Sequence, residues 1–117
     1  MNKRKIGTVY EQAAGYYLEQ QGYEILQYNY RCRAGEIDIV AREGSYIVFC
    51  EVKYRKGRGT GHALAAVDEK KQRVICRCAL FYIMEHHLSE NVAYRFDVVG
   101  IEKDKITVIR DAFPFQS

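Results

Sequence analysis

The stretch from Glu36 to Arg55 constrains the fold more than any other part of the sequence. Two runs rich in β-branched and aromatic residues, Glu36–Arg42 and Tyr46–Arg55, are separated only by Glu43-Gly44-Ser45. Such runs are typical of β-strands, and a short connection with Gly and Ser is typical of a tight turn. Because so short a connection cannot carry a crossover, the pattern predicts an antiparallel hairpin.

The flanking patterns extend this hairpin into a mixed sheet with helices packed on it. Apolar residues recur at helical spacing from about Ile6 to Gln20, and Gly22 ends this helix. A second helix is expected from about Ala63 to Glu85. Further strands are expected at residues 23–33, 92–101 and 105–110. The order α-β-β-β-α-β-β in 117 residues predicts one α/β domain over residues 1–117.

The helical spacing also predicts which side chains enter the core. For the first helix the expected buried face is Ile6, Val9, Tyr10, Ala13, Ala14, Tyr17 and Leu18. For the second helix it is Val67, Val74, Ile75, Cys78, Phe81 and Tyr82.

Charged side chains gather where the hairpin would bring its strands together. Alternate residues of a strand share one face, so Glu51 projects with Lys53, and Glu36 projects with Asp38. If the register places Asp38 beside Glu51, two carboxylates and an amine converge. Bunched acids repel each other, and a divalent cation with oxygen ligands, Mg²⁺ or Mn²⁺, removes that conflict. A metal and a neighbouring lysine together suit phosphodiester hydrolysis.

A plainer interpretation of the same residues is available. Opposite charges two residues apart are common on the exposed face of a strand. Two features favour the catalytic interpretation: this Glu-x-Lys closes the most apolar strand of the chain, and Ile37-Asp38-Ile39 lies just upstream.

Glu11 extends the candidate site to the first helix. It falls at the edge of the apolar stripe, and Gly7 and Gly15 flank it at i−4 and i+4. We expect open space around this carboxylate, which would bind the metal through water. Taken alone, an ordinary boundary glutamate is the simpler interpretation.

Positive charge follows the candidate site along the chain. Residues 53–77 hold eight basic side chains and two acids, a net charge of +6, whereas the whole chain carries +3. Such an asymmetry suits a polyanion, and a solvated helix face with a basic loop is the alternative. The predicted phosphate contacts are Arg55, Lys56, Arg58, Lys71 and Arg73.

The remaining titratable residues give weaker signals. Cys32, Cys50, Cys76 and Cys78 contain no Cys-x-x-Cys pair, so buried free thiols are expected instead of a zinc site. The histidines are expected at the surface, although His62 falls near the proposed site. No apolar run approaches the roughly 20 residues of a membrane helix, and no signal stretch opens the chain, so a cytoplasmic protein without a membrane partner is expected.

The acidic residues resemble the active-site pattern of the PD-(D/E)xK nuclease superfamily, especially archaeal-type Holliday junction resolvases. That resemblance implies that Glu11, Asp38 and Glu51 bind magnesium and that Lys53 assists the attacking water. Ile37 stands where the superfamily has its proline. Asp97 falls in a matching Arg95-Phe96-Asp97 stretch, where a structural ion pair is expected, and the role of Glu36 stays open between a further ligand and an exposed strand start.

Nearly the whole chain is similar to the YraN family of small bacterial proteins with a restriction-endonuclease-like fold. The matching stretches include Asn29-Tyr30-Arg31, Gly35–Val40 and Glu51–Arg55. The first hypothesis is therefore a Mg²⁺-dependent nuclease that acts as a homodimer on branched or otherwise structured DNA. The alternatives are a non-catalytic nucleic-acid or protein adaptor, and a nuclease that needs a partner.

Overall fold

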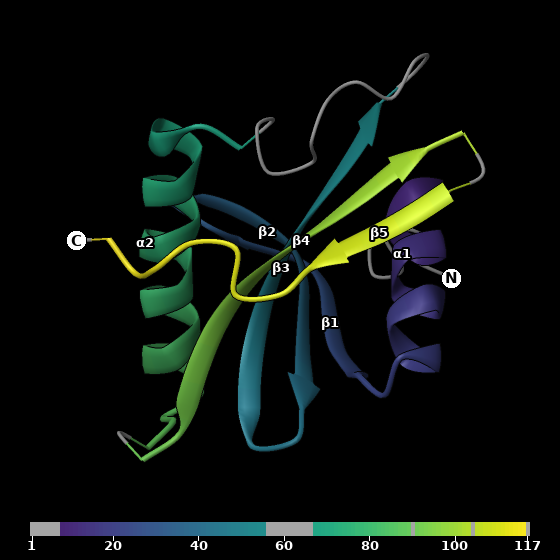
Figure 1. Ribbon diagram of the computed structural model, residues 1–117. Coiled ribbons are helices and arrows are strands. Elements are labelled where there is room, and N and C mark those ends of the chain that lie inside the picture. The colour runs from purple at the N-terminus through teal and green to yellow at the C-terminus, as the bar shows by residue number, and fades with distance from the viewer. Residues whose placement is uncertain (1–7, 56–66, 90, 104, 117) are drawn as a thin grey trace.

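The computed structural model describes residues 8–55, 67–89, 91–103 and 105–116 of the chain. They form helices α1 (Val9–Gln20) and α2 (Glu69–Glu85) and five strands. The strands are β1 (Glu24–Cys32), β2 (Gly35–Glu43), β3 (Tyr46–Arg55), β4 (Ala93–Glu102) and β5 (Lys105–Ile109). The order α-β-β-β-α-β-β confirms the mixed α/β architecture expected from the sequence and is consistent with a nuclease-like domain (Figure 1).

The five strands form one sheet in the order β1-β2-β3-β4-β5. The β2–β3 pair is antiparallel, as the turn between them predicts, with Glu43 opposite Tyr46. The β3–β4 pair is parallel, so the chain must cross over between these strands, and α2 lies in that crossover. β3 is thus the central strand, and its last residues reach the edge where the candidate acids lie.

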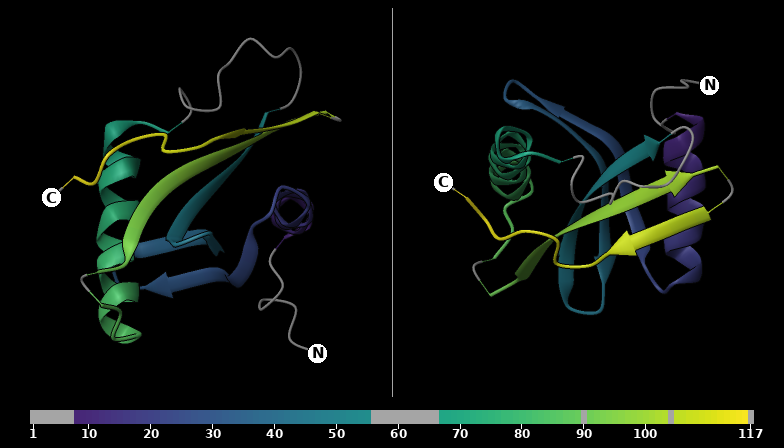
Figure 2. Two further views of the ribbon diagram at one scale, coloured as in Figure 1. Left: turned by 60° about the horizontal axis from the view of Figure 1, so that its bottom comes forward. Right: turned by 45° about the horizontal axis from the view of Figure 1, so that its top comes forward.

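The two helices cover opposite faces of the sheet, and each face has its own core (Figure 2). On the α1 face, Ala14 and Leu18 pack with Ile39, Val48 and Cys50. On the α2 face the buried side chains include Ile37, Phe49, Ile75, Cys78 and Tyr82. No helix of the described residues is long and apolar enough to span a bilayer.

The first helix differs from its predicted form in two ways. It begins at Val9 and not near Ile6, because the Thr8 hydroxyl accepts the Glu11 N–H and so caps the first turn. Ile6 lies outside the described residues. The buried face is also rotated: Val9 is 77% exposed, Tyr10 is 44% exposed and Ala13 is exposed as well, so these three predicted core positions are wrong. The face that does enter the core is Glu11, Ala14, Gly15 and Leu18.

The second helix begins later than predicted. The Asp68 carboxylate caps it by accepting a hydrogen bond from the Lys71 N–H at 2.8 Å, so α2 starts at Glu69. Val67 is buried but precedes the helix. Residues 63–66 lie outside the described residues. Cys50, Cys76 and Cys78 are buried and all four cysteines are free thiols, as expected from the sequence.

Asp97 has the structural role that was expected. Its carboxylate is fully buried on β4 and forms a two-point ion pair with Arg95 at 2.9 Å. It also accepts the Tyr23 hydroxyl at 2.6 Å and the Asp111 N–H at 2.9 Å. Every polar atom of the carboxylate therefore binds a protein donor, and this acid ties β4 to both neighbouring segments.

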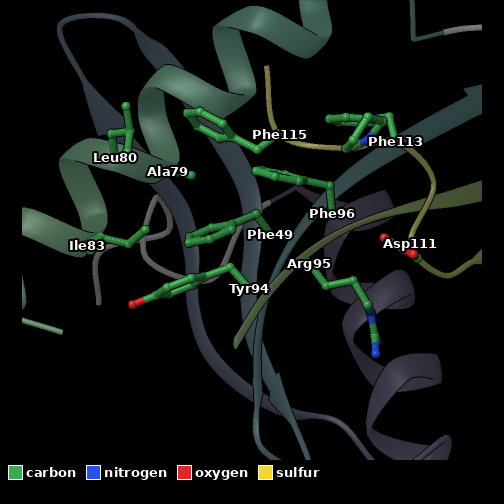
Figure 3. Close-up of a pocket in the computed structure, with 11 residues that line it drawn as sticks. Phe49, Ala79, Leu80, Ile83, Tyr94, Arg95, Phe96, Asp111, Phe113 and Phe115 are labelled. Atoms are coloured by element: carbon green, nitrogen blue, oxygen red, sulfur yellow. The ribbon is translucent and has the colours of Figure 1, made fainter. Parts of the chain in front are cut away.

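A cavity of about 340 Å³ lies on the α2 face beneath the C-terminal segment (Figure 3). Aromatic rings from β3, β4 and the C-terminal segment surround it, among them Phe49, Phe96 and Phe113. None of the predicted site residues lines it, so the candidate chemistry must be sought elsewhere.

Candidate metal centre

The candidate centre forms where β2 leaves β3. The backbone pairing of these strands ends at Ile39 opposite Cys50, although β2 itself begins at Gly35. Beyond that pair, the Asp38 carboxylate accepts the Val52 N–H at 2.8 Å. A side chain thus takes the place of a backbone acceptor, and the β1–β2 ribbon bends away from β3 (Figure 2). The bend opens the sheet beside Asp38.

Asn29 distorts the neighbouring strand at the same level. Its φ of 53° lies in the left-handed region, which asparagine tolerates better than most residues. At this level Tyr28 and Tyr30, only two residues apart, enter opposite core layers, as Ile39 and Ile37 do on the paired strand β2. The Asn29 amide donates to Glu11 Oε1 at 2.7 Å and to Glu36 Oε2 at 2.8 Å. One amide group therefore holds two acids from different elements in position.

Glu11 comes from the first turn of α1, where it forms a capping box with Thr8. The Thr8 N–H donates to Glu11 Oε1 at 3.1 Å, and the Glu11 N–H donates to the Thr8 hydroxyl at 3.2 Å. The carboxylate is only 9% exposed. A capping glutamate usually lies at the surface, so its burial against the sheet distinguishes Glu11 from an ordinary cap.

The space around Glu11 is filled differently from the sequence expectation. Gly15 does not leave a gap beside the carboxylate, because a β-carbon at this position would lie 2.0 Å from the Tyr28 hydroxyl. Gly15 therefore lets β1 approach α1 closely. Gly7 lies outside the described residues.

Three carboxylates meet in this opening of the sheet. Ligand oxygens of Glu11, Glu36 and Asp38 all lie within 4.8 Å of one another. Burial raises the pKa of Asp38 to about 8, the charge of Glu51 adds to the rise, and the Val52 N–H opposes it. Glu11 also raises the pKa of Asp38 through its charge and a side-chain hydrogen bond. Without a cation, this cluster therefore favours a shared proton.

Glu51 occupies the adjoining position on β3 and is 4% exposed. Its Oε2 lies 3.5 Å from Lys53 Nζ and 3.7 Å from Lys71 Nζ. Its Oε1 is buried, and within the described part of the chain it has no hydrogen-bond partner. A buried unpaired carboxylate oxygen is costly, and a metal ion or water would satisfy it. The donor set, all carboxylate oxygen, fits Mg²⁺ or Mn²⁺.

The predicted site residues fall into three groups. Glu11 and Asp38 lie together with Glu36, whereas Glu51 stands outside that group of oxygens, next to Lys53 and close enough to Asp38 to raise its pKa. Lys71, predicted as a phosphate contact, has its ammonium group 3.7 Å from Glu51, and Arg73 is exposed two residues further along α2. Lys56, Arg58 and His62 lie outside the described residues, and only the backbone of Arg55 is described.

Sequence reasoning missed Asn29 and left Glu36 open. Glu36 now belongs to the carboxylate group. Asn29 gave one usable signal: it is a polar residue in a tyrosine-rich strand. Its hydrogen bonds depend on a backbone inversion that no periodicity shows.

Comparison with known proteins places this geometry in a family. The profile described as "Uncharacterised protein family UPF0102" matches residues 10–101, which include all four proposed catalytic residues. The chain belongs to UPF0102. This confirms the resemblance to the YraN family seen in the sequence.

Members of UPF0102 match along nearly their whole length. A UPF0102 protein of Lachnoclostridium phytofermentans is 49% identical over 113 residues, 97% of this chain and 96% of its own. One from Caldicellulosiruptor saccharolyticus is 41% identical over 119 residues, 97% of this chain and 100% of its own. A third, from Syntrophus aciditrophicus, is 47% identical and covers 93% of this chain and 88% of its own. The similarity therefore extends over the fold and the candidate centre alike.

Proposed function

We propose that this UPF0102 chain is a metal-dependent nuclease that hydrolyses phosphodiester bonds in DNA, in particular branched or otherwise structured DNA. One observation carries the proposal. Three carboxylates whose oxygens lie within 4.8 Å of one another adjoin the buried Glu51. One oxygen of Glu51 is unpaired among the described residues, and the other lies near Lys53 and Lys71. A fold gains nothing from this repulsion, whereas a metal site requires it.

Each residue then has a defined task. Asp38, Glu51 and Glu11 would hold Mg²⁺, and Glu36 would complete the group of acids. When bound, the metal supplies Lewis-acid stabilisation of the phosphoryl oxygens and a more acidic water. Asn29 keeps Glu11 and Glu36 in position through its amide hydrogens.

Lys53 lies at the entrance of the centre. Its side chain is 31% exposed, and its ammonium group is 3.5 Å from Glu51. It can therefore orient the attacking water and offset negative charge that develops on the phosphoryl group. Lys71, 39% exposed on α2, would contact a phosphate from the other side of Glu51.

The direct test is a nuclease assay with Mn²⁺ on single-stranded, duplex, flap and four-way DNA. The wild-type chain should cut at least one of these, and Lys53→Ala should lower the rate by about 100-fold or more, as expected for loss of one charge-stabilising group. Arg42→Ala, an exposed cation at the far end of β2, is the matched control and should cut normally. Cutting that persists unchanged in Lys53→Ala would come from a contaminant and would contradict the proposal.

A metal titration distinguishes the alternatives. If Mn²⁺ neither binds nor raises the unfolding temperature, the adaptor hypothesis replaces the nuclease. If Mn²⁺ binds and Asp38→Ala abolishes that binding, yet no substrate is cut, a nuclease that needs a partner is the better description. Sedimentation of the DNA complex tests the homodimer that we propose to engage a branched duplex.

A further inference from the structure

Two exposed tyrosines stack beside the candidate centre. The rings of Tyr10 on α1 and Tyr54 on β3 have centroids 4.1 Å apart and planes inclined by only 19°. Tyr10 is 44% exposed and Tyr54 is 40% exposed. The neighbouring Tyr54 side chain raises the pKa of Tyr10. Each ring covers one face of the other, so the outer face of either ring is the part of the pair that a ligand could stack on.

The pair is connected to the centre on both elements. Tyr10 immediately precedes Glu11, and Tyr54 immediately follows Lys53. Strand alternation places Tyr54 on the α1 face of β3, whereas Glu51 and Lys53 project towards α2, so the tyrosine pair and the two lysines border the same end of β3 from opposite faces. In Figure 2 the end of β3 lies beside the N-terminal end of α1, which is where the stacked pair must be.

The surrounding charge indicates what such a surface would bind. Partly exposed Lys53 and Lys71 lie on the same end of the sheet and attract phosphate. Flat aromatic rings beside a phosphate-binding site are the arrangement by which proteins hold unpaired nucleobases, because every base has a π-face. A paired base is already stacked in its duplex and has no face to offer.

We propose that Tyr10 and Tyr54 form a stacking platform for an unpaired base next to the phosphate held at the metal centre. This rests on the proposed function and narrows its substrate class: the preferred DNA has a single-stranded or splayed nucleotide at the site of cutting. The tyrosines are positioning residues and do not take part in the chemical step.

The test measures binding without cleavage. Short single-stranded DNA with 2-aminopurine at successive positions, and the same strand in a fully paired duplex, are titrated with the chain in EDTA. Wild type should quench the fluorescence of 2-aminopurine at one position of the single strand. Tyr10→Ala and Tyr54→Ala should abolish that quenching and weaken single-strand binding by about 5- to 150-fold, and duplex binding by less than twofold.

Several variants separate stacking from stability. Tyr10→Phe and Tyr54→Phe keep the rings and should behave like wild type. Tyr10→Leu and Tyr54→Leu keep apolar bulk between α1 and β3 and should nevertheless lose the quenching, even if the alanine variants fold poorly. Tyr16→Ala removes another exposed tyrosine of α1, 64% exposed, and should change nothing.

The outcomes also separate this platform from the nuclease proposal. Quenching that depends on both tyrosines in a chain that cuts no DNA supports the platform and contradicts the nuclease. If Tyr10→Leu and Tyr54→Leu cut DNA and bind single strands as the wild type does, the stacking platform is wrong and the nuclease proposal is unaffected. If the chain binds neither the single strand nor the duplex, both the platform and the nuclease proposals are wrong.

Discussion

Asp38 is the residue at which burial and charge conflict most directly. It is held by the Val52 N–H and by its neighbours at the bend of β2, so it cannot move away from Glu51 and Glu11. The pKa of Asp38, raised to about 8 from an ordinary value of 3.8, measures that conflict in the absence of metal. The same crowding that disfavours the charged acid prepares it for a cation.

The pKa of Asp38 predicts how stability depends on pH in EDTA. The folded chain keeps its proton up to about pH 8, whereas the unfolded chain loses it near pH 3.8. The stabilisation is therefore complete below about pH 3.8 and is lost as pH rises through about 8, on the order of 6 kcal/mol in total. Asp38→Asn should remove this slope, as measured by urea unfolding at several pH values.

Glu24→Gln is the matched control, because Glu24 is an exposed acid with a 66% exposed side chain. It should leave the slope unchanged. Mg²⁺ should raise the unfolding temperature of the wild type more at alkaline than at acidic pH, since protons compete with the metal for Asp38. A slope that survives in Asp38→Asn would assign the titration to another group.

Asn29 provides a second test at the residue scale. Asn29→Ala removes both amide bonds to Glu11 and Glu36 and also strains the left-handed backbone. Asn29→Gly removes the amide without the strain. Both should weaken Mn²⁺ binding about 10- to 100-fold, whereas only Asn29→Ala should also lose stability through its backbone. Calorimetric titration and urea unfolding measure the two effects; normal metal affinity in Asn29→Gly would reduce Asn29 to a structural turn residue.

At the scale of the element, helix α1 shows what its sequence could and could not predict. Apolar periodicity indicated the helix correctly but rotated it, because Val9 and Tyr10 are as apolar as the residues that enter the core. The deciding residues are Gly15 and Glu11, which hydrophobicity scales count as neutral or polar. Gly15 is buried because Tyr28 lies against it, and the buried Glu11 carboxylate accepts a hydrogen bond from the Asn29 amide.

The acids of the hairpin could be predicted because strand alternation is a local rule. The turn at Gly44 fixes a register that ends with Ile39 opposite Cys50, and Asp38 and Glu51 are the next residue on each strand beyond that pair. Lys71 at Glu51 and the Asn29 bridge could not, because they depend on how α2 and β1 approach the hairpin in space. Local pattern predicted the residues within each element, and long-range packing determined which of them meet.

The close approach of α1 to β1 predicts an unusual effect of Gly15→Ala. Glycine to alanine within a helix ordinarily stabilises by about 1 kcal/mol. Here the new methyl group would lie 2.0 Å from the Tyr28 hydroxyl, so the free energy of unfolding should fall by about 1–3 kcal/mol. Because α1 carries Glu11, Mn²⁺ affinity should fall as well.

The double variant Gly15→Ala/Tyr28→Ala supplies the control. Without the Tyr28 ring, Gly15→Ala meets no clash. The double variant should therefore have at least the free energy of unfolding of Tyr28→Ala alone, as a double-mutant cycle measured by urea unfolding would show. Additive losses would mean that Gly15 is required for a reason other than the ring of Tyr28.

At the scale of the whole molecule, charge is distributed to suit a polyanion. The sheet and helices bury acids at one end, yet the stretch from residue 53 to residue 77, which leaves that end, carries a net charge of +6 in a chain of +3. Lysines at the centre neutralise part of the acidic charge, and the remaining cations are left to attract phosphates. A bound cation would reduce the negative charge of the carboxylate cluster, and the positive charge of residues 53–77 is what the proposed nucleic acid would meet around it.

This distribution makes the salt dependence of DNA affinity a test of the whole surface. The logarithm of the association constant falls linearly with the logarithm of salt concentration, by about 0.9 for each phosphate neutralised in duplex DNA. Lys56→Glu and Arg58→Glu should each lower that slope by about 1 and weaken binding to all DNA sequences alike. Arg42→Glu, at the opposite end of the sheet, has the same change of charge and should leave the slope nearly unchanged. Equal effects of the three reversals would show that net charge alone governs binding, and that the basic stretch is not the surface on which DNA lies.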